Sequence, residues 1–300
     1  MKKILLFALP VIFIGALCWP GRESTSQSSD PVLIGAGDIG DGLNGDPTGA
    51  LATATLVDSF PGAVVFAAGD QSHNNGTDGD YARIYDSAWG RFKARTLPAP
   101  GNHDYQSGFP FGYFDYFGPA AGDPTQGYYS LNLGSWHIIV LNTNLACTVV
   151  SCSARSPQET WLKNDLAANT KPCTMAIWHH PLYSSTGTGP GPTTAVRPFW
   201  TDLYNANADL VVNGHAHVYE RFAPQDANGN LDLVRGIIEI TAGTGGASHF
   251  SFSTVQANSL VRNNDTFGVL KLTLHPSSFD WQFIPVAGKT FTDSGTQACH

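Results

Sequence analysis

The sequence predicts an α/β fold, and two observations carry that prediction. Short apolar runs rich in β-branched residues recur along the chain, and such runs are typical of strands that are buried on both faces. The runs also share an ending, because Asp or His follows the apolar residues. They are "PVLIGAGD" to Asp38, "GAVVFAAGD" to Asp70, "CTMAIWHH" to His179 and His180, and "ADLVVNGHAH" to His215 and His217.

Stretches with helix-start signals fall between the strand runs. In "DPTGALATATLVDSF" we expect Asp46 as the N-cap and Pro47 at the first helical position. In "SPQETWLKNDLAA" we expect Ser156 and Glu159 to form a capping box around Pro157. The segment "GTGPGPTT" at 187–194 predicts a loop.

The C-terminal part has the pattern of strands. "GIIEITAGTGG" predicts one strand, and "FGVLKLTLHPSSFDWQFIPVAG" predicts a hairpin that turns near "HPSS". No internal repeat or long low-complexity linker divides the sequence. We therefore expect a single α/β domain over residues 30–300.

Composition and the N-terminus indicate the class of protein. Hydrophobic residues make up 42% of the 300 residues, which is enough for a well-filled core and excludes a disordered chain. Lys2 and Lys3 precede an apolar run from Ile4 to Leu17 that is short for a bilayer span, so we predict a signal peptide over residues 1–25 and a secreted or periplasmic protein. An uncleaved anchor stays an alternative, because "GALCWPG" has no clean small-x-small cleavage site.

Export changes how the cysteines are interpreted. Outside the signal, four cysteines remain, and an even number in an oxidising compartment favours two disulfides. Three pairings exist, of which we expect Cys147 with Cys152, closing a small loop, and Cys173 with Cys299, fixing the C-terminal tail. None of them stands in a CxxC motif, which disfavours a zinc cage.

The charge balance narrows the partners. Without Lys2 and Lys3 the chain has 14 Lys and Arg against 24 Asp and Glu, and it contains no basic run. We therefore expect no nucleic-acid binding, and no stable membrane association once the signal is removed. The oligomeric state stays open.

The polar residues after the strands are the types that metal ions require. Ligands gather at the carboxyl ends of strands in α/β sheets. Two neighbouring cations need oxygen and imidazole donors from several loops, together with one carboxylate that bridges them. Five segments supply this set in order: "GAGD", "FAAGD", "PAPGNHD", "IWHHP" and "VVNGHAHVYER".

These five segments resemble the motifs of the calcineurin-like metallophosphoesterases, and are most similar to those of the purple acid phosphatase branch. They stand here as "GDIG", "GDQSH", "GNHD", "HHP" and "GHAHVYER", from Asp38 to Arg221. The resemblance implies a two-sheet β-sandwich flanked by helices, in four layers α/β/β/α. Because the motifs begin soon after the leader, we expect the catalytic domain without the N-terminal β-sandwich of the plant enzymes.

The resemblance also implies roles for individual residues. One metal would be held by Asp38, Asp70, His73 and His217, and the other by Asp70, Asn102, His179 and His215, so that Asp70 is the bridge. His179 is preferred to His180 because the family ligand lies two residues before the proline, here Pro181. His103 would stabilise developing charge or protonate the leaving oxygen, with Asp104 orienting its ring.

Two features depart from the purple branch. His73 stands where those enzymes carry a tyrosine, so it is either a ligand or a turn residue. As a ligand, imidazole suits zinc, manganese or ferrous iron, whereas a phenolate favours ferric iron and gives the purple colour. In addition, the stretch "TGTGPGP" directly after "HHPLYSS" contains no histidine, whereas the plant enzymes carry substrate-contacting histidines there, so leaving-group recognition stays open.

The function implied is that of a secreted phosphatase with two metal ions, whose identity (Zn, Mn or Fe) stays open. It would hydrolyse small phosphomonoesters by attack of metal-activated hydroxide on phosphorus. A phosphodiesterase or nucleotidase using the same site is one alternative. A secreted binding protein that kept the fold and lost catalysis is the other.

Overall fold

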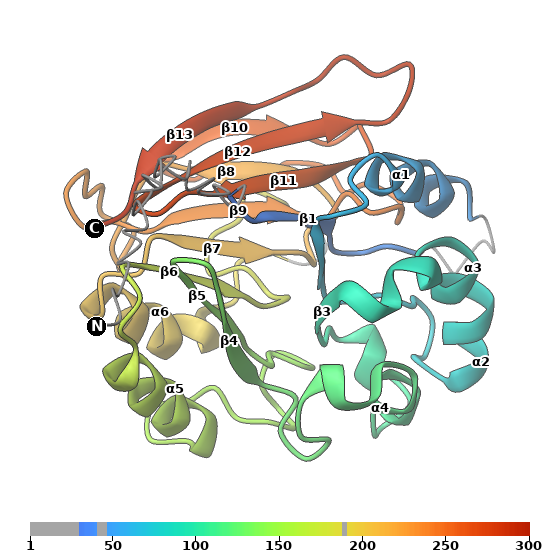
Figure 1. Cartoon of the computed structure of the whole chain (residues 1–300), viewed down its shortest axis with the longest axis horizontal. Helices are drawn as coiled ribbons and strands as arrows, with labels where there is room; N and C mark the ends of the chain where they lie inside the picture. Colours follow the sequence, from blue (N-terminus) through green and yellow to red (C-terminus); the bar gives the residue numbers. More distant parts are fainter. Residues whose placement is uncertain (1–29, 41–46, 188–190) are drawn as a thin grey trace, which may run out of the picture.

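Two mixed β-sheets, packed face to face, form the centre of the molecule (Figure 1). The computed structural model describes residues 30–40, 47–187 and 191–300. The predicted signal peptide and the expected N-cap Asp46 lie outside these residues.

The first sheet has the strand order β13-β12-β11-β1-β2-β3. Its strands β1, β2 and β3 are parallel, and β11 pairs antiparallel with β1. Strands β11 and β12 form the hairpin that the sequence predicts. The bounds are β1 Val32–Ala36, β2 Val64–Ala68, β3 Thr96–Ala99, β11 Gly268–Leu274, β12 Ser278–Pro285 and β13 Ser294–Ala298.

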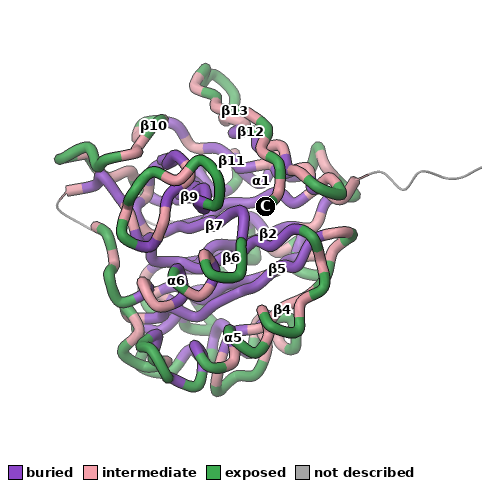
Figure 2. Tube along the Cα trace, turned by 90° about the vertical axis from the view of Figure 1, so that its left-hand side faces the viewer, coloured by how far each residue is buried: buried purple, intermediate pink, exposed green. Residues whose placement is uncertain are grey.

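The second sheet has the order β10-β8-β9-β7-β6-β5-β4. Strands β5, β6, β7 and β9 are parallel and form its centre, and they cross the molecule as buried segments in Figure 2. The bounds are β4 Tyr129–Leu133, β5 Trp136–Val140, β6 Cys173–Ile177, β7 Leu210–Asn213, β8 Tyr219–Phe222, β9 Ile238–Ala242 and β10 Ser259–Asn263.

Helices cover the outer face of each sheet, on opposite sides of the view in Figure 1. The first sheet is covered by α1 Thr48–Asp58, by α4 Phe111–Phe117 and by a helical segment between them. This segment consists of α2 Asp78–Asp80, the π-helical η1 Tyr81–Tyr85, α3 Asp86–Ala88 and the 3₁₀ helix η2 Gly90–Arg95. Helices α5 Pro157–Ala168 and α6 Arg197–Asn205 cover the second sheet. Short 3₁₀ turns lie at η3 His103–Tyr105, η4 Gly118–Ala121 and η5 Thr194–Val196.

Three apolar cores hold these layers together. Phe66, Ile138 and Leu272 are among the side chains buried between the sheets. Trp89 is part of the core beneath α1 to α4, and Trp200 of the core beneath α5 and α6. The structure therefore confirms the predicted four-layer α/β/β/α arrangement.

The two predicted helix starts were only partly right. Helix α1 begins at Thr48, one residue later than expected, and Pro47 is its N-cap. At α5, the Ser156 side chain accepts a hydrogen bond from the Glu159 amide (3.2 Å), as expected. The Glu159 carboxylate, however, accepts from the Arg155 amide (3.0 Å), because Arg155 has a positive φ of 68° that brings its N–H to the helix end.

Both expected disulfides are present. Cys147 pairs with Cys152. Cys173, at the start of β6, pairs with Cys299, the residue that follows β13, and this disulfide joins the two sheets. Among the described residues, no helix is both long and apolar enough to cross a membrane.

Candidate metal centre

The predicted site residues meet at one edge of the two sheets. Asp38, Asp70, His179 and His215 each lie two residues beyond a strand end, after β1, β2, β6 and β7 respectively. Since β1 and β2 are neighbours in one sheet and β6 and β7 are neighbours in the other, these loops converge. Asn102 follows β3, and His217 lies in the loop between β7 and β8.

The backbone at these loops is unusual. Asp38, Asp70, His215 and His217 all have positive φ angles, of 57°, 50°, 68° and 44°. Such conformations are sparsely populated by residues other than glycine and cluster at functional sites. Gly214 lets the sheets approach, because a Cβ at this position would lie 2.5 Å from the Ala68 carbonyl oxygen.

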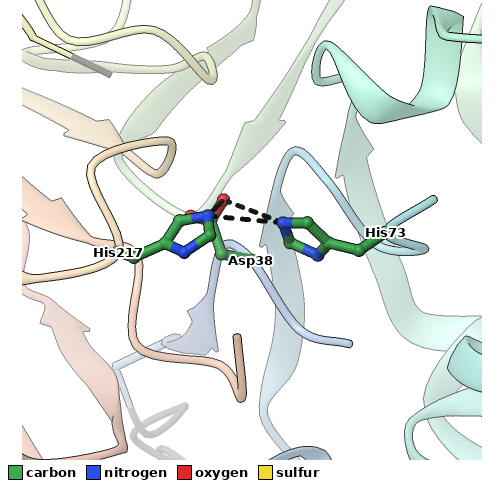
Figure 3. A group of neighbouring side chains, drawn as sticks. All are labelled: Asp38, His73 and His217. Carbon is green, nitrogen blue, oxygen red and sulfur yellow. Dashed lines mark hydrogen bonds and ion pairs between the residues drawn. The ribbon is translucent and has the colours of Figure 1, made fainter. Parts of the chain in front are cut away.

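The first set of donors comprises Asp38, His73 and His217, which are all buried or nearly so (Figure 3). The Nε2 atoms of the two histidines lie 3.3 Å apart. Asp38 Oδ1 lies 3.2 Å from His217 Nε2 and 3.9 Å from His73 Nε2. Its other oxygen, Oδ2, accepts a hydrogen bond from the His215 amide (2.7 Å). This bond connects the loop after β1 in the first sheet with the loop after β7 in the second sheet.

The second set is centred on His179. Its Nε2 lies 3.0 Å from Asp70 Oδ2, 3.1 Å from Asn102 Oδ1 and 3.2 Å from His215 Nδ1. Asp70 Oδ2 is also 3.7 Å from His73 Nε2. This one buried carboxylate oxygen therefore faces both sets of donors.

Hydrogen bonds to backbone carbonyls fix the ring orientation of two histidines. His179 Nδ1 lies 2.8 Å from the Ala68 carbonyl oxygen, and His217 Nδ1 lies 2.8 Å from that of Ser248. A carbonyl oxygen only accepts, so each Nδ1 carries a proton and each Nε2 is the nitrogen left to face a metal ion. This is the arrangement expected of metal-binding histidines.

The protonation tendencies of the histidines differ according to their surroundings. Burial lowers the pKa of His73 to about 4 and that of His215 well below its usual range, so both rings are neutral donors near pH 7. Burial would also lower the pKa of His179, but the nearby Asp70 carboxylate raises it to about 9. The pKa of Asp70 is held well below its usual range by His179, against the effect of burial.

The donor set fits metal ions. Nitrogen and oxygen ligands about 2.0–2.1 Å from a tetrahedral centre lie about 3.3 Å from one another. The distances of 3.0–3.3 Å between the closest donors of each set match this spacing. Asp38 Oδ1 is moreover buried without a hydrogen-bond partner among the described residues, a cost that a cation would remove.

His103 lies beside the first set of donors. Its ring centroid is 4.5 Å from that of His73, and its amide donates to Asp70 Oδ1 (2.8 Å). Its Nδ1 donates to the carbonyl oxygen of Asn74 (3.0 Å).

The expectation that Asp104 orients the His103 ring was wrong. Asp104 Oδ2 accepts from the amides of Asp70 (3.1 Å) and Gly101 (2.8 Å), and its Oδ1 accepts from the Tyr81 hydroxyl (2.7 Å). His103 and Asp104 are neighbours in the short 3₁₀ turn His103–Tyr105, where adjacent side chains point in different directions. The Asp104 carboxylate therefore does not face the His103 ring. Asp104 instead joins the loops that carry Asp70 and Asn102.

His180 packs against the site. Its Nδ1 lies 2.9 Å from Thr143 Oγ1, and its ring lies 4.1 Å from that of His215. Sequence reasoning missed several supporting residues, among them Tyr81, Gln71, Asn74 and Thr143. Gln71 lies within the "GDQSH" segment and Asn74 directly follows it, but neither is one of the metal-ligand positions of that motif, and Tyr81 and Thr143 lie outside all five segments.

The sequence has recognisable relatives. The family model described as calcineurin-like phosphoesterase matches residues 33–219. Purple acid phosphatase 15 of Arabidopsis thaliana is 31% identical over 180 residues, which cover 53% of this chain and 32% of that protein. An uncharacterized protein of Mycobacterium tuberculosis, Rv2577, is 29% identical over 187 residues, which cover 51% of this chain and 35% of that protein. The chain thus spans about a third of the length of these relatives.

A solved structure has the same fold. The purple acid phosphatase from yellow lupin (Lupinus luteus) seeds superposes with a TM-score of 0.73 at 22% identity, covering 91% of this chain and 54% of that one.

Proposed function

The chain belongs to the calcineurin-like phosphoesterase family, and from that premise we propose that it is a secreted, dinuclear metal-dependent phosphatase acting on phosphomonoesters. The observation that supports the proposal most is the pair of donor sets that share Asp70. The purple acid phosphatases among its relatives support the reaction class.

Each donor set would hold one cation. Asp38, Asp70, His73 and His217 would bind the first, and Asp70, Asn102, His179 and His215 the second. With imidazole at His73, the first position suits zinc, manganese or ferrous iron. When bound, such cations stabilise charge on phosphoryl oxygens and lower the pKa of water.

His103 would act as the general acid that protonates the leaving group. Its Nδ1 is committed to the Asn74 carbonyl, so Nε2 is the nitrogen that can gain or lose a proton. The protonated ring would donate from Nε2 to the ester oxygen as the bond to phosphorus breaks. The backbone hydrogen bond from His103 to Asp70 would hold this ring at a fixed place relative to the metals.

Asn102 would contribute both ends of its amide. Its Oδ1 faces His179 Nε2 in the second donor set. Its Nδ2 would then be left to donate to a phosphoryl oxygen.

Secretion is supported by the chemistry of the chain. Two disulfides suit an oxidising compartment. The leader "MKKILLFALPVIFIGALCWPG" has the pattern of a signal peptide.

The test is a substrate panel on purified protein that is stripped with chelator and reloaded with zinc, manganese or ferrous iron. Rates are compared for 4-nitrophenyl phosphate and bis(4-nitrophenyl) phosphate, which share a leaving group. Faster monoester turnover, restored by metal, supports the proposal. Preference for the diester would show a phosphodiesterase, and phosphate binding without turnover of either ester would show a binding protein.

A further inference from the structure

A short segment, residues 247–253, wraps around the metal-facing His217. The Ser248 carbonyl accepts from His217 Nδ1, and His249 Nδ1 donates to the His217 carbonyl (2.9 Å). The Ala247 amide donates to the Asp38 carbonyl (2.9 Å), and Asn264 Nδ2 donates to the Phe250 carbonyl (3.0 Å). The segment is therefore fixed to two of the donor residues.

Within this segment, the Phe250 ring lies on the His217 ring. Their centroids are 4.4 Å apart and the planes are tilted by 36°. His73 meets His217 edge-on, at 5.1 Å and 89°. Phe250 is only partly buried, and its ring lies directly against the ring of a proposed metal ligand.

A second segment, residues 184–187, runs beside the first. Thr186 and Phe252 form an antiparallel bridge, and the Ser253 amide donates to the Ser185 carbonyl (2.9 Å). Ser185 is in turn held by the fully buried Glu220, which accepts from its amide (2.9 Å) and its hydroxyl (2.5 Å). The two segments thus form a braced wall rather than a free loop.

The wall has a distinct chemistry. Residues 184–187 (SSTG) and 247–253 (ASHFSFS) contain no Lys, Arg, Asp or Glu. A leaving group that carries further negative charge would find no Lys or Arg in the wall to pair with. A planar, uncharged group could instead lie against the Phe250 ring.

Building on the proposed phosphatase function, we infer that Phe250 is the platform for the leaving group, and that the preferred substrates are monoesters whose leaving group is aromatic or otherwise planar and uncharged. Phe250 would then be a specificity-determining residue, in a chain where "HHPLYSS" is followed directly by "TGTGPGP", which contains no histidine. The rival explanation is that the ring only supports His217.

The test compares an aryl with an alkyl ester. Metal-loaded wild type, Phe250→Leu and Phe250→Ala are assayed with phenyl phosphate and n-propyl phosphate, and the ratio of the two kcat/KM values is compared among proteins. The intrinsic reactivities of the two leaving groups are the same in every assay, so they cancel when the ratio for a variant is divided by the ratio for the wild type. Phe60→Leu is the matched control, since Phe60 is a half-buried ring that precedes β2, whereas the site lies beyond the other end of that strand.

Phe250→Ala should lower the aryl-to-alkyl ratio of kcat/KM roughly 3- to 10-fold, which is the size of an aromatic contact. The ratio for Phe250→Leu should lie between those of the wild type and Phe250→Ala, and the ratio for Phe60→Leu should equal that of the wild type. Calorimetric affinity for phenylphosphonate relative to methylphosphonate should fall in parallel, and metal content should stay constant. An unchanged ratio, or loss of metal in Phe250→Leu, would overturn the inference. If the wild type hydrolysed neither ester, the phosphatase proposal would fail, and the phosphonate affinities would still decide the role of Phe250.

Discussion

At the scale of single residues, His103 is the side chain whose removal should separate proton transfer from metal binding. Its contact with Asp70 is made by the backbone amide, which remains in an alanine variant. His103→Ala should therefore keep both metals and lower kcat by roughly 10² to 10⁴, the usual size of a general acid contribution. Steady-state kinetics and metal analysis on the same sample check this, and metal loss in proportion to the activity loss would show that His103 is a ligand or structural residue.

In the proposed centre, His73 would determine which metals the first donor set accepts. Its Nε2 faces His217 and Asp70, and its ring is buried. A neutral imidazole gives no phenolate-to-iron charge transfer, so the wild type should be colourless even when loaded with iron, and His73→Tyr with ferric iron should gain a visible absorption band.

The absorption spectrum and a metal titration test this together. His73→Ala should weaken one of two metal-binding steps and leave the other unchanged. A purple wild-type protein, or equal affinities at both steps in the alanine variant, would show that His73 is a turn residue.

At this scale, the sequence shows the types of the candidate site residues more readily than it shows their contacts. The motif residues from Asp38 to His217 could be chosen because their chemistry and their place after a strand are visible in the sequence. That Asn74 anchors His103, or that Asp104 turns to the Asp70 amide, depends on the direction of each side chain in an irregular turn. No periodic pattern encodes that direction.

At the scale of elements, η1 fastens the loops after β2 and β3. The buried Tyr81 hydroxyl lies 2.7 Å from Asp104 Oδ1 and 3.2 Å from Gln71 Oε1. Gln71 Nε2 donates to the Ala99 carbonyl at the end of β3 (2.7 Å). A π-helical turn at this place is consistent with the enrichment of such turns near functional sites.

Tyr81→Phe should lower the free energy of unfolding by about 1–3 kcal/mol, because it leaves buried acceptors without their donor. Urea denaturation measures this. Tyr116→Phe is the control, since its hydroxyl bonds Asp86 at an exposed position (2.6 Å) and its removal should cost well under about 1 kcal/mol. Equal effects of the two changes would contradict the role given to Tyr81.

Buried strands were the elements that the sequence predicted best. Strands β1, β2, β6 and β7 are near-continuous apolar runs, and such runs leave few alternatives. Strand β13, "SGTQA", pairs at the sheet edge without any apolar pattern, and the short helices from α2 to η2 have no helical periodicity long enough to detect. These elements form because tertiary contacts override local preference.

At the scale of the whole molecule, His275 ties three distant parts of the chain together. Its ring nitrogens lie 2.5 Å from Asp30, before β1, and 3.1 Å from Asp280 in β12. Its carbonyl accepts from Trp136 of the second sheet (2.9 Å). The hydrogen bond to Asp30, followed by that to Asp280, raises the pKa of His275, and bonds from Thr296 and His275 lower the pKa of Asp280.

These shifts give a pH window for stability. A raised His pKa contributes stability that is complete below about pH 6.5 and is lost as the pH rises through the folded-state pKa. A lowered Asp pKa contributes stability that is present above about pH 4 and is lost on further acidification. The Tm difference between wild type and His275→Asn should therefore be largest near pH 5.5 and should shrink by about pH 9, and a difference that grows with pH would contradict the ion pairs.

The central claim is that one carboxylate, Asp70, serves two metal ions. It is tested most directly by the metal content per chain, measured by inductively coupled plasma mass spectrometry on purified wild type, Asp70→Ala and Asp38→Ala after identical loading. Wild type should hold two ions and Asp38→Ala about one, because Asp38 faces only the first donor set. Asp70→Ala should lose most of both ions, since without the shared carboxylate each set lacks a donor and the two cations repel each other unscreened. An Asp70→Ala protein that still holds two ions per chain would contradict the account.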